Sequence, residues 1–75
     1  MLEEKIEVLY NTIQERKHQW SEYVKLFGED HCLTKGVFET IWGLEEAFQI
    51  ISGRSYTSVF IERLDAMRAS MGGMY

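Results

Sequence analysis

The residues best suited to chemistry lie together in one short segment, Glu29-Asp30-His31-Cys32, and His18 is the other histidine of the chain. Imidazole, thiolate and carboxylate groups can bind zinc, and a cysteine beside a histidine can act as a nucleophile. Consecutive residues rarely bind one ion together, however, and the paired ligand spacing of a zinc site is absent. The side chains of His31 and Cys32 diverge if they continue into a helix, and no third orienting group is evident. We therefore expect no metal site, no cofactor and no enzymatic activity, because a turn and a helix cap explain this segment.

Two apolar stripes with helical spacing flank the segment, and they indicate the elements that position it. The stripes consist of Leu2, Ile6, Leu9, Ile13, Trp20, Val24 and Phe27, and of Leu33, Val37, Ile41, Leu44, Phe48 and Ile51. Spacing of three and four residues predicts amphipathic helices over about 2–27 and 32–52. Gly28 can adopt the left-handed conformation that ends the first helix, and Asp30 or Thr34 can cap the second.

The two stripes match across the turn as an antiparallel hairpin. The expected facing pairs are Phe27 with Leu33, Val24 with Val37, Trp20 with Ile41, Ile13 with Phe48 and Leu9 with Ile51. The second helix is expected to stop at Gly53, and a third helix over about 55–71 begins with Ser55 or Thr57 as its cap. The predicted fold is all-α: a helical hairpin plus a third helix, closed as an up-down-up bundle or as an intertwined helical dimer. Residues 1–71 form the single domain, and 72–75 are expected to be a flexible tail.

Composition narrows the classes of partner. The net charge of −4, with eight basic residues that form no cluster, argues against binding to nucleic acid. A single cysteine, Cys32, excludes an internal disulfide and favours a reducing compartment. No signal peptide and no apolar stretch of about 20 residues is recognised, so a cytoplasmic protein without a membrane partner is expected. A core this small supplies only about 3 to 5 kcal/mol of stability, which favours self-association.

The helix over 32–52 carries a second stripe, made of small residues: Gly36, Thr40, Gly43 and Ala47. A glycine inside a helix costs about 1 kcal/mol relative to alanine, so Gly36 and Gly43 suggest that another helix approaches closely. That helix can belong to the same chain, for example with Trp20 over the glycines, or to a second chain.

Phe38 and Trp42 lie one turn apart on the same helix, well off its main apolar stripe. An aromatic pair of this kind is typical of the anchors of protein interfaces. The alternative is that the third helix leans over and buries both rings.

Arg16 and Lys17 interrupt the apolar stripe of the first helix at its middle. The hairpin register places them level with Glu45, which makes an ion pair between the helices reasonable. A basic interruption can fix register or the choice of partner, as polar groups do in coiled coils. The alternative is an aliphatic stem along the apolar surface with its charged head in water.

A resemblance to a known family begins at Phe27. Its residues are Phe27-Gly28-Glu29-Asp30-His31, Leu33-Thr34, Gly53-Arg54-Ser55-Tyr56 and Glu62-Arg63-Leu64. About half of the chain resembles tetratricopeptide repeats of the kinesin-light-chain type, which join helical pairs through a Gly-acidic-His turn. The resemblance implies a protein-binding helical scaffold that self-associates.

The short chain, the surplus apolar residues and the missing catalytic set predict a non-enzymatic protein–protein interaction module, a homodimer that can also bind one other protein. The candidate interface residues are Gly36, Gly43, Phe38, Trp42, Arg16 and Lys17. The alternative is an acidic regulator or inhibitor from a phage or mobile element, which acts on a nucleic-acid-binding protein by charge mimicry. That function would depend on Glu3, Glu4, Glu7, Glu39 and Glu46.

Overall fold

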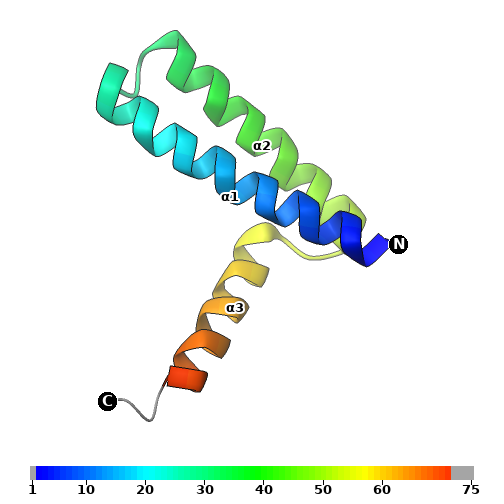
Figure 1. Ribbon diagram of the computed structural model, residues 1–75. Helices are drawn as coiled ribbons and strands as arrows, with labels where there is room; N and C mark the ends of the chain where they lie inside the picture. The colour runs from blue at the N-terminus through cyan, green and yellow to red at the C-terminus, as the bar shows by residue number, and fades with distance from the viewer. Residues whose placement is uncertain (1, 72–75) are drawn as a thin grey trace.

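The computed structural model describes residues 2–71, which form three α-helices: α1 (Leu2–Phe27), α2 (Cys32–Ser52) and α3 (Tyr56–Met71). Helices α1 and α2 lie side by side as an antiparallel hairpin, and α3 leaves the hairpin at a steep angle from the part near the N-terminus (Figure 1). The predicted all-α class and all three helices are confirmed, and no strand occurs within residues 2–71. The tail expected at 72–75 lies outside the described residues.

The turn between α1 and α2 depends on Gly28 and His31. Gly28 has φ +87°, and its N–H donates to the carbonyl oxygen of Val24 at 2.9 Å, as predicted for a left-handed helix end. His31 is the N-cap of α2, since its Nδ1 accepts a hydrogen bond from the Leu33 N–H at 3.1 Å. The imidazole also stacks on the Phe27 ring at a centroid distance of 4.8 Å. This stacking holds the imidazole so that Nδ1 faces the N–H groups at the start of α2.

The prediction that Asp30 or Thr34 caps α2 was wrong. Thr34 is fully buried inside the first turn of α2, where its hydroxyl donates to the Tyr23 carbonyl oxygen at 3.5 Å. Asp30 lies one residue before the cap, so His31 takes the position from which a side chain reaches the Leu33 N–H. A histidine acceptor replaces the usual Ser, Thr, Asp or Asn oxygen.

The connection from α2 to α3 follows the predicted signals. Gly53 has φ +77°, and its N–H donates to the Gln49 carbonyl oxygen at 2.9 Å. Ser55 caps α3, because its Oγ accepts from the Ser58 N–H at 3.2 Å. The third helix begins at Tyr56, one residue after the expected start, and only three residues separate it from α2.

The buried core lies where all three helices meet. Tyr10, Ile13, Phe48 and Tyr56 are buried there, and Ile6, Leu9, Leu44, Val59 and Phe60 pack around them. Tyr10 lies 6.1 Å from Phe48 between ring centroids, and Ile13 and Phe48 are almost completely inaccessible to solvent. These contacts agree with the predicted antiparallel register, in which Ile13 faces Phe48.

Helix α3 docks on the hairpin through its first half. The Tyr56 ring lies between Tyr10, 5.1 Å away, and Phe48, 6.2 Å away. About two turns further along α3, two guanidinium nitrogens of Arg63 donate to the two carboxylate oxygens of Glu7, at 2.9 and 2.6 Å. The Arg63 guanidinium carbon also lies 4.0 Å from the Tyr10 ring centroid. We call these contacts the elbow.

The elbow sets α3 across the hairpin, whereas an up-down-up bundle needs α3 to run along the groove between α1 and α2 (Figure 1). The Tyr56 ring, held between Tyr10 and Phe48, and the Arg63–Glu7 pair fix the direction of α3 at two points along the helix. Within one copy of the chain, the groove between α1 and α2 therefore has no third helix over it.

We expect loss of the His31 cap to destabilise the hairpin. The His31→Ala variant removes the acceptor for the Leu33 N–H and should lower the free energy of unfolding by about 1 kcal/mol. The His31→Asn variant keeps a capping acceptor and should lose clearly less. Urea unfolding followed by far-UV circular dichroism measures both, and equal midpoints for His31→Ala and the unchanged chain would show that the cap contributes nothing.

A second expectation concerns alkaline pH. Burial, and next the neighbouring Tyr10 phenol, raise the pKa of Tyr56 above its ordinary value. The contribution of Tyr56 to stability is then fully present below the usual tyrosine pKa of about 10, and it is lost as pH rises through the raised value in the folded protein. Thermal unfolding between pH 8 and 11 should show a smaller loss of stability for Tyr56→Phe than for the unchanged chain. Parallel losses in the two proteins would contradict this role of the phenol.

Candidate functional site

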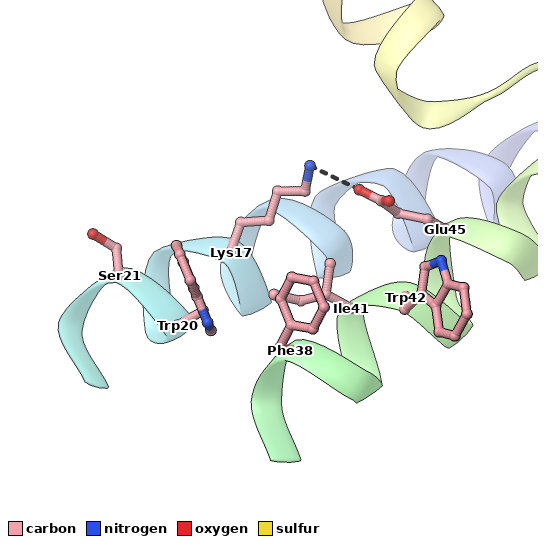
Figure 2. A pocket seen from close by; sticks show the side chains of 7 residues that line it. All are labelled: Lys17, Trp20, Ser21, Phe38, Ile41, Trp42 and Glu45. Atoms are coloured by element: carbon pink, nitrogen blue, oxygen red, sulfur yellow. Dashed lines mark ion pairs between the residues drawn. The ribbon is translucent and has the colours of Figure 1, made fainter. Parts of the chain in front are cut away.

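An open hollow lined mostly by apolar side chains lies between α1 and α2. Its volume is about 350 Å³, and its lining residues are Lys17, Trp20, Ser21, Phe38, Ile41, Trp42 and Glu45. Trp20 from α1 and Phe38 from α2 lie across from each other at a ring centroid distance of 6.2 Å, and Trp42 lies one turn further along α2 (Figure 2). We call this hollow the aromatic groove.

Helix geometry explains why the aromatic rings gather here. Phe38 and Trp42 are four residues apart on α2, so they share one face of that helix. Ile41 lies beside them on the buried face, where it is shielded from solvent. Trp20 belongs to the apolar stripe of α1, but its indole is only partly buried because the facing position on α2 does not cover it. Rigid helices therefore hold three aromatic side chains at one surface.

An ion pair crosses the groove between the two helices. The Lys17 ammonium group pairs with the Glu45 carboxylate (dashed line in Figure 2), and the distance from Nζ to the nearer oxygen is 2.7 Å. This is the ion pair that the register made reasonable. The same ammonium group lies 4.3 Å from the Tyr56 ring centroid, so Lys17 also connects the groove to the elbow. The partly buried Lys17 side chain thus contacts both α2 and the first residue of α3.

Arg16 behaves differently from Lys17. Its guanidinium donates to the Gln19 side chain at 3.2 Å on the same helix, and the Arg16 side chain is exposed. The structure therefore separates the two basic residues that the sequence presents together: Lys17 lines the groove, whereas Arg16 does not.

Phe38 and Trp42 stay exposed. Their exposed fractions are 55% and 72%, so the alternative in which α3 leans over and buries them is wrong. The elbow directs α3 away from this part of α2. Three aromatic rings at the surface of a 75-residue chain form the kind of patch that marks an interaction site.

The stripe of small residues on α2 is also open. A Cβ atom placed on Gly36 or Gly43 would meet no atom within 4 Å apart from the neighbouring backbone of α2, so the alternative in which Trp20 packs over these glycines is wrong. Trp20 packs against Phe38 instead. Because residues 36 and 43 lie about a third of a turn or more from residues 38 and 42 on a helix, the two sets of predicted interface residues face different directions.

The groove continues toward the interhelical turn into an acidic hollow. This second hollow has a volume of about 380 Å³ and is lined by Trp20, Glu29, Asp30, Lys35, Phe38 and Glu39. Trp20 and Phe38 belong to both hollows, so the surface changes from aromatic to acidic along one line.

Outside the two hollows, several charged side chains form ion pairs, and others lie exposed on the surface. The hydrogen bond from Arg63 lowers the pKa of the Glu7 carboxyl, and the hydrogen bond from Arg54 lowers that of Glu62. Of the carboxylates on which an acidic regulator would depend, Glu7 is thus engaged in the elbow, while Glu39 and Glu46 are exposed on α2. That alternative function stays a prediction.

The segment with the most reactive side chains serves the turn. The Cys32 Sγ lies 4.0 Å from the His31 Nδ1, which already accepts the capping hydrogen bond, and His18 pairs with Glu22 at 3.2 Å. Within residues 2–71 no three His, Cys, Asp or Glu side chains gather so that they could hold a metal ion. Over the same residues, no helix is both long and apolar enough to cross a membrane.

Comparison with protein-family models, with curated proteins and with solved structures finds no match to this chain. The resemblance of the segments between Phe27 and Leu64 to tetratricopeptide repeats therefore stays a prediction.

Sequence reasoning missed two residues that shape the site. Tyr10 is buried at the elbow although it is absent from the apolar stripe of α1. Its spacing of four residues from Ile6 and three from Ile13 is the signal that could have found it. Trp20 belongs to the apolar stripe predicted for the core, but in the structure its partly buried indole forms one wall of the groove.

Replacing Gly36 or Gly43 tests whether another helix packs closely against the stripe of small residues on α2. Since a methyl group at Gly43 meets no atom within 4 Å, we expect Gly43→Ala to stabilise the isolated chain by about 1 kcal/mol through helix propensity. Gly36→Ala should behave in the same way. Chemical unfolding measures both changes, and a loss of stability or of self-association would show that a second helix approaches the stripe closely.

Proposed function

We propose that this chain is a small non-enzymatic protein–protein interaction module that self-associates through its apolar helix faces, and that the aromatic groove is the contact surface. The observation that supports this proposal is the exposure of Phe38 and Trp42 beside Trp20, on two helices that the Lys17–Glu45 ion pair connects. Tryptophan is among the residues that most often dominate the binding energy of an interface.

The energetics favour association through this groove. Apolar surface gains about 25 cal/mol for each Å² removed from water, and a fully buried tryptophan contributes 150 to 250 Å², so each indole can add several kcal/mol. The rigid hairpin positions the rings in advance, which lowers the conformational entropy lost on binding. The buried core of the chain is small, and association would add apolar burial that one copy cannot supply.

The partner we propose is a second copy of the chain, with one other protein as a further partner. A reducing, cytoplasmic setting suits the exposed free thiol of Cys32. No cofactor takes part in this function. Binding of this kind depends on aromatic burial and should be only weakly sensitive to salt, in contrast to binding by an acidic regulator.

The test is the substitution Trp42→Ser, compared with Leu26→Ser as a matched control. Both side chains are 72% exposed, but Leu26 lies outside the aromatic groove. Sedimentation equilibrium over a hundredfold dilution under reducing conditions should show a dimer for the unchanged chain and for Leu26→Ser. Trp42→Ser should weaken dimerisation at least about 30-fold, the loss expected for a dominant interface residue.

Far-UV circular dichroism shows whether each variant keeps its helices, which both should. A helical monomer at every concentration of the unchanged chain would refute self-association. A Trp42→Ser dimer as tight as that of the unchanged chain would remove the groove from the interface.

A further inference from the structure

The second half of α3 lies outside the buried core, and within residues 2–71 its side chains hydrogen-bond to the hairpin only through the Arg63–Glu7 pair of the elbow. We define the outer half of α3 as residues 61–70. Ile61 is 52% exposed and Met67 is 59% exposed, whereas Tyr56, Val59 and Phe60 in the first half pack into the core cluster. A helical segment of ten residues is marginal in water without tertiary contacts. Its apolar side chains therefore gain from a surface that covers them.

The outer half of α3 presents an ordered strip. Ile61, Leu64 and Arg68 have the spacing i, i+3 and i+7, so they lie on one face of the helix. Arg68 makes no ion pair or hydrogen bond with any residue of the described range 2–71, while Arg54 and Arg63 both bind carboxylates. Asp65 lies on the same side, about 40° from Ile61 around the helix axis, so the strip carries two apolar side chains and one charge of each sign, with the free Arg68 guanidinium at its end.

Along α2, the aromatic groove and the acidic hollow follow each other as an apolar surface and then a negatively charged one. Phe38 and Trp42 give an apolar stretch, and the acidic hollow beyond them contains Glu29, Asp30 and Glu39, with Lys35 as its single basic residue. Seven residues separate Ile61 from Arg68 on α3, and seven separate Trp42 from Lys35 on α2, about 10 Å in each case. The two surfaces therefore match in length and in apolar character, and the free Arg68 at the end of the strip is opposite in charge to the acidic hollow.

The geometry excludes a contact between the two surfaces within one copy. The elbow, which reaches from Tyr56 to Arg63, directs α3 away from the hairpin, so the end of the outer half lies far from the groove of its own copy (Figure 1). The start of α3 nevertheless borders the same side of the hairpin, since Tyr56 and Thr57 line hollows with Lys17, Trp42 and Glu45. Two copies that face each other across a two-fold axis can each bring the outer half of α3 over the groove of the other.

We propose that the outer half of α3 from one copy binds in the aromatic groove of a second copy, and that Arg68 enters the acidic hollow there. The contact forms twice around the two-fold axis, which closes the assembly as a dimer. This inference rests on the proposed function and deepens it, because it names the segment that occupies the groove. A second copy is favoured over a foreign helix because both complementary surfaces belong to this one chain.

The experiment measures the dimer dissociation constant of charge-reversal variants by sedimentation equilibrium. Arg68→Glu should weaken the dimer at least about tenfold, because like charges then meet in the acidic hollow. The double variant Arg68→Glu with Glu39→Arg should regain at least about threefold of that loss by restoring opposite charges. Lys5→Glu is the matched control: it makes the same charge change on α1, outside the groove, and should leave the dimer unchanged.

A substitution of an apolar residue supplies independent evidence. Ile61→Ser should weaken the dimer, and it should keep the helices of the monomer because Ile61 is exposed. Circular dichroism on every variant confirms that the fold is intact before association is compared.

The outcomes separate this inference from the proposed function. If Trp42→Ser breaks the dimer but Arg68→Glu and Ile61→Ser leave it intact, the groove binds another segment and the inference is wrong while the proposed function stands. If Arg68→Glu weakens the dimer and the double variant recovers nothing, the pairing with the acidic hollow is wrong. If the unchanged chain is a monomer, the inference fails together with self-association.

Discussion

The insertion of the Tyr56 ring between Tyr10 and Phe48 is the contact on which the arrangement of the chain depends. It brings all three helices into one buried cluster, and it does so at the first residue of α3. Tyr56 therefore anchors the start of α3 on the hairpin. Arg63 fixes the direction of α3 at a second point by binding Glu7 and lying over the Tyr10 ring. The elbow decides which surfaces are covered and which remain open.

Lys17 links the elbow to the aromatic groove. Its ammonium group lies beside the Tyr56 ring and also pairs with Glu45 on α2, so one side chain contacts all three helices. The pair is partly exposed, and a surface ion pair alone adds at most about 1 kcal/mol. Its position agrees with the antiparallel register of the hairpin, in which Trp20 packs against Phe38 further toward the interhelical turn.

The hairpin could be predicted from the sequence because its determinants are local. The limits of α1 and α2, the left-handed glycines at both turns and the pairing of Lys17 with Glu45 follow from spacing along the chain. The exposed aromatic pair was predictable for the same reason, since Phe38 and Trp42 lie off the apolar stripe. The direction of α3 was not predictable, because it depends on how the rings of Tyr10, Phe48 and Tyr56 pack in three dimensions. The identity of the N-cap was missed because histidine is an unusual acceptor, and it works here only because Phe27 holds its ring.

The two open surfaces of α2 differ in what they can contribute. Open glycines at residues 36 and 43 expose backbone and add little apolar area, so this face gains little unless another helix comes very close. The aromatic groove, in contrast, offers large rings that are already ordered, next to carboxylates that can select a basic partner. A chain that buries few side chains gains most where large apolar area lies beside complementary charge. On this chain that place is the groove, and the outer half of α3 is the segment whose own exposed apolar residues and free arginine fit it best.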